Sequence, residues 1–282
     1  MKKIPILIKE DSPFLTAETR KTRWAIPYDF ECLNARIDKL LRQNLDDIKG
    51  KKILDIGSHI GTFSYSALKL GAIFVQGIDT EKKTIERGKE LFKQTKVDES
   101  QYNFQVGDAL GYLESLEEGS FDTIFCLGTL YYMVEPHRLL QLMQKVAKKT
   151  ILIDTFTASY STIQGKEAPL IYKAIKEETL KLPMMLTVLT QPEKKSYRLP
   201  HSFQHNKKDL SLITLPTCAL LETWFQSLGM PFELIDWSDH KKQPCTYHDL
   251  LNPEQKKSSH WADIYTSGVR VSYSLKTNSP NL

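Results

Sequence analysis

Between residues 52 and 155, short apolar runs alternate with longer segments that carry apolar residues at helical spacing. The short runs are nearly continuous in apolar residues, which is typical of strands buried on both faces of a sheet. Strands that alternate with helices in this way pair in parallel, and the helices cover both faces of the sheet. The alternation therefore predicts an α/β fold built on a parallel sheet.

The individual elements follow from these patterns and from the glycines that end them. The predicted strands cover residues 52–56, 72–78, 102–106, 121–127 and 150–154. The predicted helices between them cover residues 62–70, 81–95, 109–116 and 136–148. After residue 217 the chain returns to the pattern, with a helix at 218–228, a strand at 232–237 and a final strand at 269–275.

Two regions lie outside the alternation. Residues 1–50 contain an amphipathic helix from about Phe30 to Leu45, with one apolar stripe formed by Leu33, Ile37, Leu40, Leu41 and Leu45. Residues 156–216 form an insertion with a helical piece around 169–181, and a connection of this length is usually a lid or a substrate-binding cap. We therefore expect an N-terminal helical extension (1–50) and a domain at 51–282 with an inserted cap at about 156–216.

Composition and charge narrow the class of protein. The 282 residues are 41% hydrophobic and 26% charged, as in ordinary globular proteins, and no stretch approaches the roughly 20 apolar residues of a membrane helix. The four cysteines are scattered without a CxxC pair, which fits a reduced compartment. We expect a cytoplasmic protein with no membrane partner. The formal charge of +4 permits contact with nucleic acid but does not require it, and clusters such as 20–23 are interpreted as solvated loops.

A glycine-containing turn follows the first predicted strand. Asp55 ends the strand, Gly57 lets the chain turn tightly, and Gly61 lets the next helix start close to the sheet and to a ligand. Asp79 ends the second strand, where a carboxylate can accept both hydroxyls of a ribose, and Asp108 follows the third strand, within reach of an adenine amino group. The spacing D-x-G-x-x-x-G differs from the dinucleotide pattern and suits a ligand that has no phosphate.

This turn resembles the first motif, D-x-G-x-G-x-G, of class I S-adenosylmethionine-dependent methyltransferases. The resemblance implies S-adenosylmethionine as cofactor and a seven-stranded Rossmann-like sheet with helices on both faces. It also implies that Asp55 and Gly57 lie by the methionine part of the cofactor, that Asp79 holds the ribose, and that Asp108 with Ala109 flanks the adenine. The predicted cofactor-binding residues are Asp55, Gly57, Ser58, Gly61, Asp79, Asp108, Ala109 and Gly128.

His59 stands where the motif has its middle glycine. Three roles are open for this side chain: a proton acceptor, a hydrogen-bond donor to the carboxylate of the cofactor's methionine part, or a turn residue that points to solvent. The predicted catalytic residues are His59, Tyr131 and Arg270.

A finer resemblance involves the carboxy-S-adenosylmethionine-dependent enzymes that modify the tRNA wobble uridine. It is carried by the segments 122–143, 214–230 and 268–276. It implies that Gly128 and Tyr131 line the transfer site, and that Arg270 lies near the reactive end of the cofactor.

One departure from this second family affects the expected chemistry. Where the family has His-Arg-Arg after the tyrosine, this chain has Tyr132, Met133 and Val134. Because these basic residues are absent, we expect an ordinary methyl donor. We then expect Arg270 to pair with the substrate or with a structural partner such as Asp239 or Asp263.

Other chemistries find little support in the sequence. His201 and His205 have the i, i+4 spacing of a zinc site, but Pro200 and Asn206 make the segment loop-like, so no metal is expected. No G-x-S-x-G elbow and no P-loop is present. The favoured function is S-adenosylmethionine-dependent methylation of a small organic molecule at O or N. The alternatives are methyl or carboxymethyl transfer to a tRNA wobble uridine, and a non-catalytic cofactor-binding protein of the same fold. The oligomeric state is left open.

Overall fold

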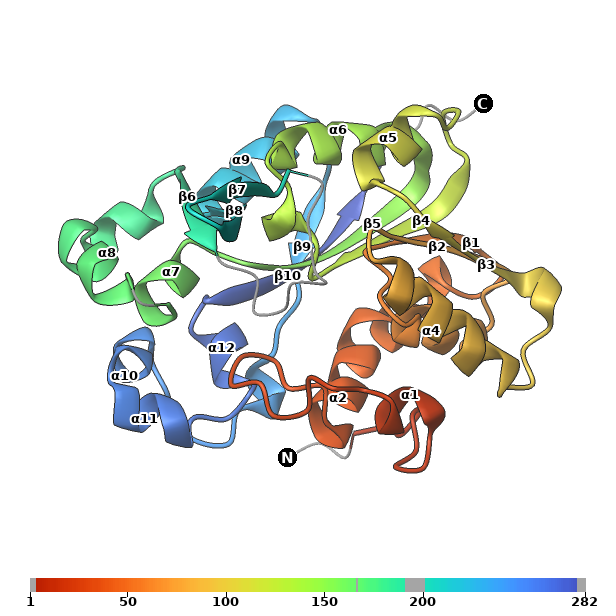
Figure 1. Cartoon of the computed structure of the whole chain (residues 1–282), viewed down its shortest axis with the longest axis horizontal. Helices are drawn as coiled ribbons and strands as arrows, with labels where there is room; N and C mark the ends of the chain where they lie inside the picture. Colours follow the sequence, from red (N-terminus) through yellow and green to blue (C-terminus); the bar gives the residue numbers. More distant parts are fainter. Residues whose placement is uncertain (1–3, 166, 191–200, 278–282) are drawn as a thin grey trace.

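The computed structural model describes residues 4–165, 167–190 and 201–277. Its centre is a seven-stranded sheet with the order β3-β2-β1-β4-β5-β10-β9, which runs through the middle of the molecule (Figure 1). The strands are β1 (Lys52–Ile56), β2 (Phe74–Asp79), β3 (Tyr102–Val106), β4 (Phe121–Leu127), β5 (Ala147–Phe156), β9 (Phe232–Leu234) and β10 (Arg270–Lys276).

The predicted parallel pairing is confirmed for the first five strands. The final strand differs, because β10 runs antiparallel to both of its neighbours, β5 and β9. The order reverses at β1, which pairs with β2 on one side and with β4 on the other. In open α/β sheets, ligands bind at such a switch point, beyond the carboxyl ends of the strands.

Helices cover both faces of the sheet, as expected (Figure 1). Alternate residues of the central strands face opposite layers: Ile124 packs with α5, α6 and α9, whereas Phe125 packs with α2 and α3. The covering helices are α2 (Phe30–Leu40), α3 (Thr62–Lys69), α4 (Lys82–Lys93), α5 (Ala109–Glu114), α6 (Pro136–Val146) and α9 (Cys218–Ser227).

The N-terminal helix is shorter than predicted. Leu33, Ile37, Leu40 and Leu41 are buried, but the α-helix ends at Leu40. The following residues, Arg42–Asp47, form the 3-10 helix η1, whose three-residue turns rotate side chains off the stripe of a 3.6-residue helix. Leu45 is therefore 37% exposed, and its assignment to the apolar stripe is wrong.

The described part of the insertion after β5 contains short helices and a small sheet. The helical piece predicted near 169–181 corresponds to α8 (Ala168–Ala174) and the 3-10 helix η4 (Glu177–Lys181), preceded by α7 (Ser159–Ile163). A three-stranded antiparallel sheet follows, which the sequence analysis did not anticipate. Its strands are β6 (Met185–Thr190), β8 (Lys208–Pro216) and β7 (Phe203–His205).

The remaining short elements connect these layers. The strand predicted at 232–237 ends at Leu234, and Trp237 is buried in the following loop instead. The short helices are α1 (Pro13–Thr16), η2 (Glu99–Gln101), η3 (Leu130–Tyr132), η5 (Ser238–His240), α10 (Tyr247–Leu251), α11 (Pro253–Ser258) and α12 (Asp263–Thr266). Within the described ranges, no helix combines the length and the hydropathy that a membrane span requires. All four cysteines are free thiols.

Candidate functional site

The turn between β1 and α3 has an unusual backbone. Gly57, His59 and Gly61 have φ angles of 70°, 51° and 79°, in the left-handed region that glycine enters most easily. The amides of Gly57 and Ser58 donate to the carbonyl oxygen of Ile78 at 2.8 and 3.0 Å, which fastens the turn to β2. His59 thus adopts a backbone conformation that glycine adopts most easily, and the motif that this turn resembles has a glycine at this position.

The neighbours of the two glycines leave no room for a side chain. A Cβ atom at Gly57 would lie 2.0 Å from Thr129 Oγ1, and one at Gly61 would lie 2.7 Å from Phe104 Cζ. Thr129 Oγ1 is itself fixed, because it donates to the Ile56 carbonyl at 3.0 Å. The glycines therefore allow close packing within the protein, whatever space they also give to a ligand.

We expect Gly57→Ala to lower the melting temperature and to abolish binding of S-adenosylhomocysteine, because the new methyl group displaces Thr129 and distorts the turn. Gly50→Ala is the matched control: Gly50 has a φ of 72°, but no atom lies within 4 Å of its Cβ position. The control carries only the left-handed backbone strain, about 1–2 kcal/mol. Thermal unfolding and calorimetry measure both effects, and equal behaviour of the two variants would contradict the packing argument.

Two carboxylates lie at the ends of β1 and β2. Asp55 is 3% exposed and accepts a hydrogen bond from Ser64 Oγ at 2.6 Å. Burial raises the pKa of Asp55 to about 7, and the charge of Asp79 adds to the increase, which the Ser64 hydrogen bond partly offsets. Asp79 accepts from the amides of His59 at 3.0 Å and Glu81 at 2.9 Å, and burial raises its pKa as well. A ligand cation or hydroxyl donor would stabilise the ionised form of both groups.

The other predicted cofactor residues have local roles of their own. Asp108 caps α5, because its Oδ2 accepts from the Gly111 amide at 3.0 Å, and Ala109 is buried. Ser58 is buried against Gly77 of β2, and its Oγ has no hydrogen-bond partner in the part of the chain that the structure describes. A role for Ser58 in cofactor binding stays a prediction.

His59 contacts the N-terminal segment. Arg20 Nη2 lies 3.0 Å from His59 Nδ1, and the same guanidinium forms two hydrogen bonds with Glu18 and lies over the Tyr28 ring. Because arginine only donates, His59 Nδ1 accepts. Burial, reinforced by the Arg20 charge, lowers the pKa of His59 to about 3. The ring is therefore neutral and poorly suited to accept a proton, and it lies under Arg20 rather than pointing to solvent.

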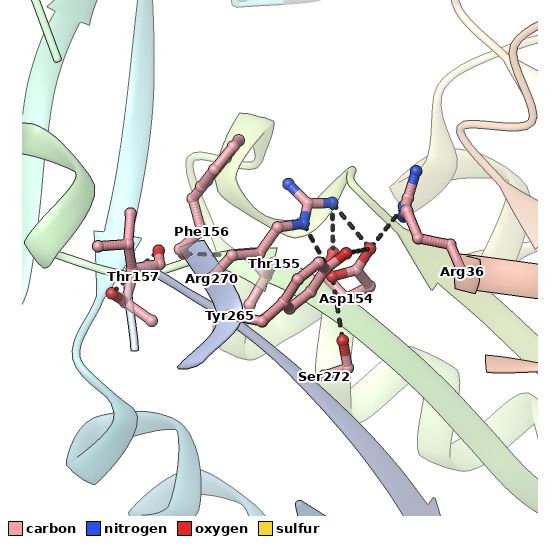
Figure 2. A network of polar contacts seen from close by, with 9 residues as sticks. Arg36, Asp154, Thr155, Phe156, Thr157, Tyr265, Arg270 and Ser272 are labelled. Atoms are coloured by element: carbon pink, nitrogen blue, oxygen red, sulfur yellow. Dashed lines mark hydrogen bonds and ion pairs between the residues drawn. The ribbon is translucent and has the colours of Figure 1, made fainter. Parts of the chain in front are cut away.

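Asp154 is the centre of a buried polar network (Figure 2). Arg270 donates from Nε to Oδ1 at 2.8 Å and from Nη2 to Oδ2 at 2.9 Å, and Arg36 Nη2 donates to Oδ2 at 2.5 Å. The hydroxyls of Tyr265 and Ser272 donate to the same carboxylate. Burial alone would raise the pKa of Asp154, but the two guanidinium groups outweigh it and hold the pKa below its usual value.

The structural partner of Arg270 is thus Asp154, and the predicted partners Asp239 and Asp263 are wrong. The antiparallel pairing of β10 with β5 sets Arg270 opposite Phe156, two residues from Asp154, which brings the two charged groups together. Asp239 instead pairs with Lys39 at 2.7 Å, and Asp263 accepts from the His260 amide at 2.7 Å.

Arg36 belongs to this network but is not among the residues predicted from the sequence. It lies on α2, is fully buried, and has the rings of Tyr28 and Phe63 within about 5 Å of its Cζ. Its Nε and Nη1 have no hydrogen-bond partner among the described residues. The signal was present in the sequence, since Arg36 follows Leu33 by three residues and so interrupts the apolar stripe with a charge.

The structure brings together the three residues predicted at the transfer site. A Cβ atom at Gly128 would lie 3.2 Å from Arg270 Nη2 and 4.0 Å from the Tyr131 hydroxyl. The Tyr131 ring packs against Phe156 with centroids 5.2 Å apart, and Phe156 lies under the Arg270 guanidinium. Thr129, which contacts Gly57, follows Gly128 directly, so this cluster adjoins the β1–α3 turn.

Comparisons with known proteins agree with this geometry. A family model described as "Methyltransferase domain" matches residues 47–211, more than half of the chain. The chain belongs to this methyltransferase family. Among solved structures, a putative S-adenosylmethionine-dependent methyltransferase from Listeria monocytogenes superposes with a TM-score of 0.54 over 86% of this chain and 99% of its own, at 12% identity. The S-adenosylmethionine-dependent methyltransferase from Mesorhizobium loti gives 0.51 at 14% identity over 83% and 94%.

Curated relatives match shorter stretches of the methyltransferase chain. A ubiquinone biosynthesis O-methyltransferase of Neisseria meningitidis is 27% identical over 103 residues, which is 36% of this chain and 42% of the relative. A tRNA U34 carboxymethyltransferase of Idiomarina loihiensis is 29% identical over 107 residues, 37% of this chain and 32% of the relative. The chain thus spans less than half of the length of the curated relatives it matches.

The predicted class I methyltransferase fold and its S-adenosylmethionine cofactor are confirmed at the level of the family. The roles of individual residues remain predictions. In the described ranges, no group of three or more His, Cys, Asp or Glu side chains is arranged to hold a metal ion.

Proposed function

We propose that this chain transfers a methyl group from S-adenosylmethionine to an oxygen or nitrogen of a small organic molecule. The observation that carries the choice of an ordinary methyl donor is the bidentate contact of Arg270 with Asp154. A carboxylate on the cofactor would have to compete with this internal carboxylate for Arg270, in a position where both charges are desolvated.

The residues at the ends of β1 and β2 fit the cofactor. Asp79 offers a carboxylate to the ribose hydroxyls, and Asp55 with the left-handed turn at Gly57 lies by the methionine part. Ala109 supplies an apolar wall and Asp108 an acceptor for the adenine. Burial raises the pKa of Asp55 when the site is empty, and a cationic ligand beside it would favour the charged form.

S-adenosylmethionine supplies an activated methyl group, so the protein mainly has to position the acceptor. Holding a nucleophile about 3 Å from the methyl carbon and excluding water are the main contributions expected of the chain. Tyr131 suits this role: burial raises the pKa of its phenol, so the hydroxyl stays protonated and can donate a hydrogen bond to the acceptor. We assign the insertion at 156–216 as the cap over the acceptor.

The test offers the protein S-adenosylmethionine and its carboxylated form in equal amounts, and native mass spectrometry identifies the bound species. We expect wild type to retain S-adenosylmethionine, and Arg270→Leu to retain it too. Asp239→Ala, which removes a half-exposed charge outside the network, is the control. Preferential retention of the carboxylated form by wild type, lost in Arg270→Leu, would overturn the proposal.

That opposite result would select the second candidate, modification of a tRNA wobble uridine. The observation in its favour is the partial match to a tRNA U34 carboxymethyltransferase. Binding of tRNA with a steep dependence on salt would support it.

A further inference from the structure

A cavity of about 560 Å³ opens beside the N-terminal segment. We call it the basic bowl, and it is lined by residues that include Lys21, Arg23, Trp24, Lys256, Lys257 and Trp261. This volume is within the range of roughly 300–1,000 Å³ that is usual for small-molecule sites. None of the residues predicted to bind the cofactor lines the bowl.

The charge of the bowl is not balanced within the fold. Among the described residues, no carboxylate pairs with Lys21, Arg23 or Lys256, and the pairing of Lys257 with Glu254 is an exposed contact of little strength. The two carboxylates of the lining are already engaged. Asp29 caps α2, and Glu31 accepts from Lys242 and His260. The lining therefore carries four cationic side chains against two carboxylates, an excess of positive charge.

Two tryptophans add a second kind of contact. Trp24 is half-buried, its Nε1 donates to the Lys256 carbonyl at 2.9 Å, and the Lys256 ammonium lies 5.0 Å from its ring. Trp261 is 6% exposed, and its Nε1 has no hydrogen-bond partner in the described ranges. A buried donor without a partner is unfavourable unless a ligand or water satisfies it. The Trp261 Nε1 atom is itself inaccessible, so the lining offers cations and aromatic surface to a ligand.

The bowl is connected to the candidate site on two sides. Its wall at 21–24 directly follows Arg20, which contacts His59 of the cofactor turn at 3.0 Å. Lys256 Nζ donates to the Ile163 carbonyl at the end of α7, and Tyr160 of the same helix stacks on Phe156 beside Arg270. The bowl is therefore joined to the elements that form the transfer site by one chain segment and by one hydrogen-bonded helix.

We propose that the basic bowl binds the phosphate groups of the methyl acceptor, so that the acceptor is a phosphate-bearing molecule. The identification of the bound molecule as the methyl acceptor rests on the proposed function. Binding of phosphate can be measured without turnover. Lysine and arginine are the side chains that recognise phosphate, and a tryptophan face can stack on a ring attached to it. Excess cations in a concave site favour this occupant over a neutral one.

The experiment measures binding of inorganic pyrophosphate and of a single-stranded RNA oligonucleotide to the full chain by calorimetry at low salt. We expect the double variant Lys21→Ala/Arg23→Ala to weaken binding at least about tenfold, since two charge-assisted contacts are removed. Lys83→Ala/Lys89→Ala is the matched control, because it removes two equally exposed charges on α4, away from the bowl. We expect the control to change binding less than about twofold, the effect of net charge alone.

The outcomes separate the sources of the phosphate. Pyrophosphate binding that falls only in the bowl variant supports the proposal with a small phosphorylated acceptor. RNA that binds far more tightly than pyrophosphate, and weakens in the bowl variant, supports phosphate recognition with nucleic acid as the source. Equal losses in both double variants, or no binding of either probe by wild type, would overturn the proposal. Binding of S-adenosylhomocysteine, measured in parallel, reports separately on the proposed function.

Discussion

Replacing Asp154 with alanine is expected to destabilise the protein by ~3–5 kcal/mol, because it leaves the buried guanidinium groups of Arg36 and Arg270 without their shared counter-ion. The carboxylate is fully buried and accepts hydrogen bonds from four side chains, so its loss leaves several buried donors unsatisfied. Denaturant unfolding of wild type and Asp154→Ala measures the difference in the free energy of unfolding.

Asp239→Ala is the control for the loss of an aspartate charge. Asp239 pairs with Lys39 at 2.7 Å, and their side chains are 32% and 7% exposed, so the pair is only partly buried and we expect a smaller loss, about 1–2 kcal/mol. A loss as small for Asp154→Ala would show that the network of Figure 2 contributes little to stability.

The same network predicts a dependence on pH. Because the two arginines hold the pKa of Asp154 below its usual value, its contribution is fully present above the unfolded pKa of about 3.9. It is lost as the pH falls through the folded pKa. The stability of wild type should therefore fall more steeply below about pH 4 than that of Asp154→Ala, and parallel curves would contradict this assignment.

Asp79→Ala is expected to weaken binding of S-adenosylhomocysteine tenfold or more. The variant removes a charged acceptor from two ribose hydroxyls, and hydrogen bonds to charged groups contribute roughly 1.5–3 kcal/mol. It also frees the amides of His59 and Glu81, which loosens the turn that holds the ligand. Calorimetry measures the affinity, and circular dichroism checks the fold.

Asp98→Ala is the matched control for Asp79→Ala. Asp98 also accepts a backbone hydrogen bond, from Ser100 at 2.8 Å. It precedes β3 and so lies near the amino ends of the parallel strands, whereas Asp79 lies at the carboxyl end of β2. We expect Asp98→Ala to bind S-adenosylhomocysteine as tightly as wild type does. Wild-type affinity in a folded Asp79→Ala protein would remove Asp79 from the cofactor site.

Local pattern determined much of the fold and half of the candidate site. The strands 52–56, 102–106 and 121–127 are confirmed at both ends, because short apolar or alternating runs between polar segments favour strands. The turn from Asp55 to Gly61 and the carboxylate of Asp79 were also predictable. Their place at the ends of β1 and β2 follows from the local sequence, although the turn also packs on Phe104 and Thr129.

The tertiary structure alone decided the other half. Asp154 lies 118 residues from Arg36 and 116 from Arg270, and no local pattern indicates which of several aspartates will meet which arginine. The choice follows from the antiparallel pairing of β10 with β5 and from the packing of α2 against the sheet. The basic bowl has the same origin, since its walls come from 21–31, Gln164 and 256–261. The periodicity of apolar residues is a local property of the sequence. Ion pairs between distant residues form only when the packing of the chain brings them together, because a buried charge is stable only beside an opposite charge.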